Sequence, residues 1–164
     1  MKTALRIEDL SFRYPAYPGL PSAALFSGLD LELPEGGICL LLGKAESGKS
    51  TLCRILMGLA PRFTGGELSG RILLHDRPIE RRPPFDLLQE IGLVFQNPSE
   101  QLFCASCESE VAFALESLGQ PRVEMRRRVA AALKWMGLRQ FRDRNPATLS
   151  GGEKKKLALA CLEA

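Results

Sequence analysis

The sequence predicts one domain of the α/β class, in which antiparallel strands come first, a strand–loop–helix unit follows and a helical segment comes last. Three observations support this prediction. Leucine alternates with acidic residues over Leu29–Leu33, as in a half-buried strand. The apolar run Ile38–Leu42 precedes a glycine-rich loop and an amphipathic helix, and helical periodicity dominates the chain after Pro98.

The composition fits a globular domain with its own core. The chain has 164 residues, of which 45% are hydrophobic and 25% charged. Its net charge of +3 is too small to indicate a nucleic-acid partner. Glu8 and Asp9 stand where a signal peptide would need an apolar stretch, and no apolar run is long enough to span a bilayer. We therefore expect a chain that starts and stays in the cytoplasm.

The first half of the chain contains the predicted strands. Leu5–Tyr14 alternates loosely and is followed by the proline-rich loop Tyr14–Pro21. The Leu29–Leu33 strand stops at a Pro-Glu-Gly-Gly turn. Ile38–Leu42 is apolar without alternation, which predicts a strand buried on both faces within a parallel sheet. The helix expected after the glycine-rich loop covers Lys49–Leu59.

Two further strands and three helices are predicted beyond this helix. Arg71–Leu74 is a short strand, and Ile91–Phe95 is another apolar strand. Glu108–Leu118 and Arg122–Met136 are helices, each closed by a glycine. A last helix follows Ser150.

The cysteines indicate packing rather than a disulfide framework. Apolar contexts predict small core positions for Cys39, Cys53 and Cys161. Cys104 and Cys107 form a lone C-x-x-C motif, which leaves open a redox or zinc role beside the simpler interpretation of two reduced thiols. His75 is the only histidine, so a site of three histidines is excluded.

Residues 43–51 read GKAESGKST and match G-x-x-x-x-G-K-S. Main-chain N–H groups curled around an anion supply the donors that phosphates need. Gly43 and Gly48 permit the required geometry, and the helix that begins at Lys49 directs its N–H groups and positive dipole end at the same place. This predicts a nucleotide phosphate cradle. The alternative is a turn capped by Ser47 or Ser50, which explains the glycines but not the lysine.

Each polar side chain at the C-terminal end of the predicted cradle has an expected role. Lys49 contacts the β- and γ-phosphate oxygens, Ser50 ligates Mg²⁺, and Thr51 contacts the α-phosphate side. The other ATP-binding positions of the loop are Gly43, Lys44, Ala45, Glu46, Ser47 and Gly48.

The segment Leu149–Glu153, LSGGE, has two interpretations. Ser150 and Glu153 form the pattern of a capping box in front of a helix. A capping box does not need Gly151 and Gly152, which lower helix stability by about 1 kcal/mol each. Lysines beside a positive helix end are also unfavourable. A polyphosphate approaching this end would account for both features.

At this point the chain resembles a known family. GKAESGKST, then Gln96 at the end of a strand, then LSGGE resemble the ATP-binding subunit of ABC transporters over the whole chain. VFQNPSEQLF, SEVAFALESLG and LKWMGLRQFRDRNPATLSGGEKKK are similar to energy-coupling-factor ATPases, which drive uptake of vitamins and of cobalt or nickel ions.

The resemblance implies a P-loop NTPase fold of ABC type, with a mixed sheet, an antiparallel N-terminal β subdomain and a helical insert. It divides the domain into a nucleotide-binding core (1–96), a helical subdomain (97–150) and the start of the signature helix (151–164). The implied activity is hydrolysis of Mg·ATP at the cytoplasmic face of the membrane. The implied partners are a second ATPase subunit, identical or paralogous, and a transmembrane component that meets the helical insert at about 99–148.

The resemblance also assigns residues outside the phosphate loop. Tyr14 would stack on adenine, or alternatively pack on the core as a strand-end aromatic. Gln96 would reach Mg²⁺ and the attacking water beside the catalytic Lys49, or alternatively form a plain Gln-Asn-Pro turn. The signature residues Ser150, Gly151 and Gly152 would close on the γ-phosphate of ATP held by the second subunit, head to tail.

Glu46 departs from the family pattern, which has glycine at its place. A left-handed backbone costs a non-glycine residue about 1–2 kcal/mol. A carboxylate about 4 Å from a phosphate charge is repelled by roughly 4 kcal/mol at an effective dielectric near 20. We therefore expect Glu46 to point outward, where it pairs with Lys44 or faces the second subunit.

A second departure is at the end of the sequence. The family's Walker B aspartate, catalytic glutamate and switch histidine would follow Ala164. We therefore expect a truncated transport ATPase that binds nucleotide poorly and hydrolyses it negligibly by itself. Two alternatives stay open, which are a non-catalytic nucleotide-binding module and, because of Glu46, a DNA-repair type of ABC ATPase.

Overall fold

The structure, a computed structural model, describes residues 2–16, 24–80 and 82–164. It divides into two compact units, Met1–Gly92 and Leu93–Ala164, which we call the sheet unit and the helical unit. Most of the proline-rich loop predicted over Tyr14–Pro21 lies outside the described residues. Among the described helices, none is long and apolar enough to cross a membrane.

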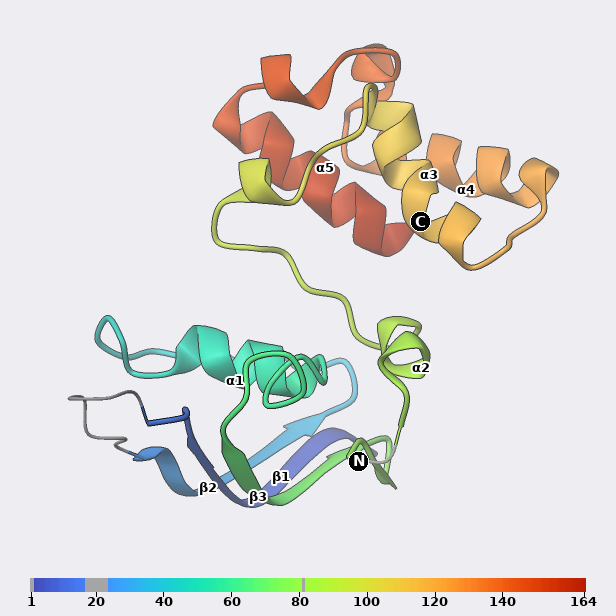
Figure 1. Ribbon diagram of the computed structural model, residues 1–164. Coiled ribbons are helices and arrows are strands. Elements are labelled where there is room, and N and C mark those ends of the chain that lie inside the picture. The colour runs from blue at the N-terminus through green and yellow to red at the C-terminus, as the bar shows by residue number, and fades with distance from the viewer. Residues whose placement is uncertain (1, 17–23, 81) are drawn as a thin grey trace. The chain divides into compact units, whose positions relative to one another are not determined.

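The sheet unit contains an antiparallel sheet of four strands in the order β2-β1-β3-β4 (Figure 1). β1 spans Thr3–Arg13, β2 spans Ala24–Pro34, β3 spans Glu67–Leu74 and β4 spans Arg77–Pro78. The predicted N-terminal strand and the predicted strands at Leu29–Leu33 and Arg71–Leu74 are confirmed, although the latter two begin earlier than expected. The short β4 was not predicted.

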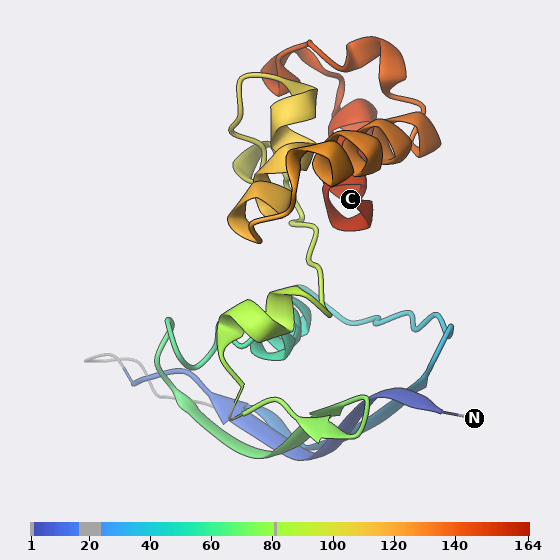
Figure 2. The same cartoon turned by 90° about the vertical axis from the view of Figure 1, so that its right-hand side faces the viewer.

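Helix α1 (Lys49–Leu56) lies over one face of this sheet (Figures 1 and 2), and a short helix α2 (Pro84–Leu88) follows β4. Leu52 and Ile55 of α1 are buried in the same cluster as residues of β1 and β3. The helix predicted after the glycine-rich loop is therefore confirmed. It ends at Leu56, three residues before the predicted end.

The prediction of a buried strand over Ile38–Leu42 is wrong for this structure. The segment has no strand pairing, and the exposed fractions are 99% for Ile38, 78% for Leu40 and 78% for Leu42. Ile91–Phe95 is likewise not a strand. A strand buried on both faces needs a neighbour for its N–H and C=O groups, and none of β1–β4 pairs with either segment. The parallel part of the expected sheet is therefore absent from the described residues, and Cys39 is exposed instead of buried.

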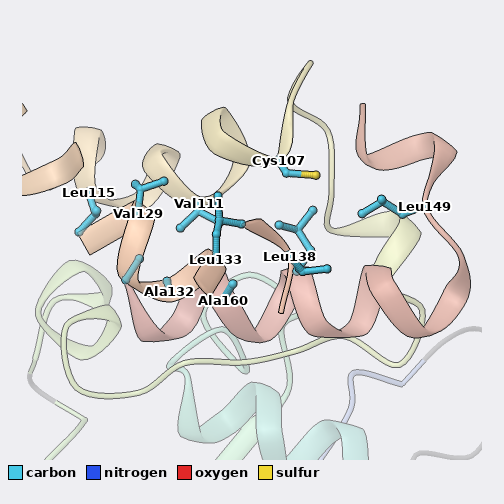
Figure 3. Close-up of a cluster of buried hydrophobic side chains, with 11 residues drawn as sticks. Cys107, Val111, Leu115, Val129, Ala132, Leu133, Leu138, Leu149 and Ala160 are labelled. Atoms are coloured by element: carbon cyan, nitrogen blue, oxygen red, sulfur yellow. The ribbon is translucent and has the colours of Figure 1, made fainter. Parts of the chain in front are cut away.

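The helical unit packs three helices around one core, α3 (Cys107–Ser117), α4 (Arg122–Trp135) and α5 (Gly151–Glu163). Figure 3 shows side chains from all three meeting in this core. The 3₁₀ turns η1 (Pro98–Glu100), η2 (Arg139–Phe141) and η3 (Pro146–Thr148) lie in the connections. The fully buried core side chains include Cys107, Val111, Leu115, Val129, Leu133, Leu138, Leu157 and Ala160. All three helices predicted in this half of the chain are confirmed.

Candidate functional site

The glycine-rich loop leads into α1 without a side-chain cap. The residue before the helix is Gly48, in the left-handed conformation with φ 90° and ψ 1°, and no side chain accepts a hydrogen bond from the first turn. The interpretation of the loop as a turn capped by Ser47 or Ser50 is therefore wrong. The first N–H groups of α1 are left for another acceptor, which is what an anion site at a helix N-terminus requires.

Gly48 is required by packing as well as by its backbone angle. A Cβ atom at this position would lie 2.7 Å from Cε1 of Phe26 and 2.9 Å from Cγ of Leu25. A Cβ atom at Gly43 would lie 2.6 Å from Oγ of Ser47. Side chains of β2 thus pack closely against the loop at Gly48. At its other end, Gly43 lies close to Ser47 of the same loop. A side chain at either glycine would therefore force its neighbours and the loop to shift.

The ammonium group of Lys49 lies inside this loop. Its Nζ atom donates to the main-chain oxygens of Gly43 at 2.8 Å and Lys44 at 2.7 Å, and to Oγ of Ser47 at 3.2 Å. Ser50 follows on the first turn of α1 and is exposed. A phosphate group could take the place of these acceptors around the ammonium group. The residues present therefore fit the triphosphate of a nucleotide, and the exposed Ser50 hydroxyl would be a candidate ligand for Mg²⁺.

Glu46 has the backbone conformation that the sequence suggested, with a positive φ of 65°. The residue is exposed, as expected for an outward side chain. Among the described residues it forms no ion pair, so the expected contact with Lys44 is not made here. The other expectation, that Glu46 faces a second subunit, stays a prediction.

Tyr14 packs against the core next to the loop. Its ring meets that of Phe12 edge to face, with centroids 5.0 Å apart and planes at 81°. Its hydroxyl group lies 3.0 Å from Oγ1 of Thr51, which is 6% exposed. The core-packing interpretation of Tyr14 therefore holds in this structure. Stacking on adenine stays a prediction.

Gln96 belongs to the helical unit and is exposed. Asn97 caps η1, because its side chain accepts a hydrogen bond from the N–H of Ser99 at 3.2 Å. The segment before Gln96 is fixed by Gln101, whose amide oxygen accepts from Phe95 N at 3.0 Å and whose amide nitrogen donates to Leu93 O at 3.2 Å. This role of Gln101, the second glutamine of QNPSEQ, was not predicted from the sequence. A Mg²⁺ site shared by Ser50 and Gln96 stays a prediction.

The LSGGE segment forms a complete capping box. The N–H of Glu153 donates to Oγ of Ser150 at 3.3 Å, and the N–H of Ser150 donates to a carboxylate oxygen of Glu153 at 2.7 Å. Hydrogen bonding of the Ser150 side chain and main chain to the carboxylate holds the pKa of Glu153 below its usual range. Cβ atoms at Gly151 and Gly152 would meet nothing within 4 Å. Packing in the described chain thus does not explain the two glycines, and the signature role of this helix end stays a prediction.

The C-x-x-C motif lies in the helical unit and has no features of a metal site. No cluster of three or more metal-ligating side chains occurs in the part of the chain that the structure describes. Sγ of Cys107 donates to the main-chain oxygen of Arg144 at 3.2 Å. Burial raises the pKa of the Cys104 and Cys107 thiols, and it raises the pKa of Cys161 to about 12. All three sulfur atoms are therefore thiols at neutral pH, which disfavours a reactive redox pair.

Comparisons with known proteins show the family of the chain. The family model described as ABC transporter matches residues 26–164. The chain belongs to the ABC transporter family. A solved structure titled cbiO1 from Clostridium perfringens, part of the ABC transporter complex cbiONQ, has a TM-score of 0.82 and 32% identity to this ABC chain. It covers 99% of this chain, which in turn covers 61% of it.

Curated ABC relatives are similar over nearly the whole chain. An ABC transporter ATP-binding protein of Pyrococcus horikoshii is 41% identical over 156 residues, and the energy-coupling factor transporter ATP-binding protein EcfA1 of Ligilactobacillus salivarius is 38% identical over 156 residues. Each match includes 95% of this chain, but only 54% and 52% of the respective relatives. An ABC relative in Methanosarcina acetivorans is 41% identical, and the match spans 25% of its length. The chain therefore spans only about a quarter to a half of the length of these relatives.

Proposed function

We propose that this ABC chain carries the nucleotide-binding part of an ATPase that energises uptake of a small solute, a vitamin or a transition-metal ion, through an energy-coupling-factor type of transporter. The observation that carries the proposal is the uncapped start of α1 beside a loop that already encloses the ammonium group of Lys49. The likeness to cbiO1 and EcfA1 supports the energy-coupling-factor type.

In this proposal each of the expected site residues acts on one part of Mg·ATP. The N–H groups of the loop and of α1 hold the phosphates, and Lys49 neutralises charge at the β- and γ-phosphate oxygens. Ser50 and Gln96 ligate Mg²⁺, which supplies charge neutralisation and orientation when it is bound. Tyr14 contacts the adenine end.

A second ATPase subunit completes the proposed site. Gly151 and Gly152 leave the N-terminus of α5 open to an approaching phosphate, since a Cβ atom built at either glycine would meet no described residue within 4 Å apart from its chain neighbours and the main chain of α5 itself. Together with Ser150 they would receive the γ-phosphate of ATP bound by that subunit, head to tail. This arrangement gives two half-sites per dimer and explains why glycines follow a helix cap.

The proposed surface for the transmembrane component lies on the helical unit. A groove of about 280 Å³ lies beside α4 and η2, and its lining combines apolar and charged side chains. It is lined by Glu108, Arg126, Val129, Ala130, Leu133, Arg139 and Arg142. A helix of a membrane protein that reaches the cytoplasmic face could insert apolar side chains and pair with these charges, which would hold the ATPase at the membrane surface.

One observation favours a second candidate, a nucleotide-binding module without hydrolysis. Ile38–Leu42, directly before the phosphate loop, is exposed and not paired in a sheet, so the loop has support from α1 and β2 alone. A DNA-repair type of ATPase is less consistent with the described chain, because the described residues between the phosphate loop and LSGGE form β3, β4, α2 and the compact helical unit, and no long coiled coil.

The proposal is tested by calorimetric titration of the purified chain with Mg·ATP. Lys49→Ala is expected to weaken binding at least about 100-fold, because it removes charge-assisted contacts to two phosphate groups. Lys134→Ala is the matched control, since Lys134 is an exposed lysine on α4 and is not one of the expected ATP-binding residues. It is expected to change the affinity less than about threefold. Equal binding by wild type and Lys49→Ala would overturn the proposed nucleotide site.

Hydrolysis separates the two candidates. Phosphate release above the rate of Lys49→Ala by the chain, or by the chain mixed with a second ATPase subunit, supports the ATPase. Tight Mg·ATP binding without release in both samples supports the non-catalytic module.

A further inference from the structure

The hydroxyl groups of Tyr14 and Thr51 connect two parts of the sheet unit that are 37 residues apart in sequence. Tyr14 directly follows β1, and Thr51 is the third residue of α1. The two oxygen atoms are 3.0 Å apart in a partly buried environment, and Thr51 itself is 6% exposed. The contact therefore joins the end of β1 to the first turn of α1.

We propose that Tyr14 is a positioning residue for the phosphate site, acting through its hydroxyl group on Thr51. The proposal rests on the proposed function, in which Thr51 contacts the α-phosphate side of the nucleotide. It concerns the phenol oxygen and is independent of any stacking of the ring on adenine.

The direction of the hydrogen bonds follows from the chemistry of the three groups. A threonine hydroxyl has one hydrogen to donate and two lone pairs to accept with. Ionised phosphate oxygens can only accept. When Thr51 donates its hydrogen to a phosphate, Tyr14 must therefore be the donor to Thr51. Tyr14 then donates to Thr51, and Thr51 donates to the phosphate. Both hydrogen bonds point in the same direction, so each bond strengthens the other.

The packing of the Tyr14 ring fixes the position of this hydroxyl group. The ring rests edge to face on Phe12, which is 1% exposed in the core of the sheet unit. Phe12 belongs to β1, whereas Thr51 belongs to the helix that presents the phosphate site. The tyrosine thus holds the threonine hydroxyl against a rigid strand, so that less rotamer freedom is lost when a phosphate binds.

The test uses a ligand that has no base to stack on. Binding of Mg·tripolyphosphate to the full chain is measured by calorimetry for wild type and for Tyr14→Phe, which keeps the ring and removes the hydroxyl. We expect Tyr14→Phe to bind roughly three- to tenfold more weakly, the effect of one hydrogen bond. Combined with Thr51→Val, Tyr14→Phe should cause no further loss, because the group it acts on is gone.

A purely structural role would give a different result. In that case Tyr14→Phe lowers the melting temperature but leaves the affinity for Mg·tripolyphosphate unchanged, and the proposal is overturned. If Tyr14→Phe does not fold, 3-fluorotyrosine provides the readout. In a Tyr17→Phe background it replaces Tyr14 alone, since the chain has two tyrosines. The hydroxyl of 3-fluorotyrosine is more acidic and is therefore a stronger donor. It should tighten binding of Mg·tripolyphosphate when Thr51 is present but not in the Thr51→Val variant. Unchanged binding would overturn the proposal.

Failure of this proposal can be told apart from failure of the proposed function. If wild type binds Mg·tripolyphosphate and Tyr14→Phe binds it equally well, the positioning role is wrong and the phosphate site stands. If wild type binds neither Mg·ATP nor Mg·tripolyphosphate, both are wrong for this chain.

Discussion

The carboxylate of Glu110 accepts a hydrogen bond from the main-chain N–H of Cys104 over 2.6 Å. The same carboxylate oxygen accepts a second bond from the N–H of Phe103 at 2.9 Å. Glu110 is 5% exposed and lies on α3, so this single side chain fixes the loop between η1 and α3 to the helix. That loop follows Gln96, which makes Glu110 a structural support for the predicted Mg²⁺-binding segment.

We expect Glu110→Ala to lower the free energy of unfolding by about 1–3 kcal/mol, because two partly buried N–H groups lose their acceptor. Glu110→Gln keeps an acceptor oxygen and should recover part of the loss. Urea denaturation followed by circular dichroism measures both. Glu116→Ala, an exposed glutamate on the same helix, is the matched control. A loss as small as that of Glu116→Ala would contradict the supporting role of Glu110.

Replacement of Glu46 is expected to strengthen nucleotide binding. Glu46→Gln removes the negative charge but keeps the left-handed backbone, whereas Glu46→Gly removes both the charge and the strain at φ 65°. Both variants should bind Mg·ATP about two- to tenfold more tightly at low salt, with glycine the tighter. For Glu46→Gln the gain should shrink as salt rises. Equal or weaker binding by Glu46→Gly in a calorimetric titration would sink this prediction.

The capping box of α5 predicts a pH dependence of stability. The folded pKa of Glu153 lies below the unfolded value because hydrogen bonds from Ser150 stabilise the carboxylate. The stabilisation is therefore complete above the unfolded pKa of about 4.3 and is lost as the pH falls through the folded pKa. Glu153→Gln should melt at a lower temperature than wild type at pH 7, and the difference should disappear in acid.

Thermal melting between about pH 2 and pH 7 checks this dependence on Glu153. Glu163→Gln serves as control, because Glu163 is an exposed glutamate near the other end of α5. A melting-temperature difference for Glu153→Gln that is the same at all pH values would show that the carboxylate charge has no part in the cap.

The apolar segment Ile38–Leu42 predicts self-association of the chain. Ile38, Leu40 and Leu42 expose 99%, 78% and 78% of their surface, and an exposed apolar stretch with unpaired main-chain groups is a site of aggregation. Leu40→Lys should lower the apparent mass at micromolar concentration. Light scattering measures it, and Leu41→Lys, at a less exposed position with 44%, is the comparison. An unchanged mass for Leu40→Lys would exclude this segment as the contact.

Several features of the site were predictable from the sequence because they depend on neighbouring residues. The loop 43–51, the start of α1 at Lys49 and the positive φ at Glu46 all follow from short-range geometry. The capping box at Ser150 and Glu153 is also local, as both residues lie within one helical turn. The partners of Tyr14 and Glu110 were not predictable, because residues 51 and 103–104 reach them only through the packing of other elements.

The sequence by itself determined the helices of the helical unit, the antiparallel strands and the phosphate loop, since side-chain periodicity and glycine positions act over one or two turns. Only the tertiary structure decided the state of Ile38–Leu42 and Ile91–Phe95. Their apolar composition suits a buried strand, but a strand forms only where another strand accepts its hydrogen bonds. In the described residues no such strand is present, so the same residues that predict burial are exposed to solvent.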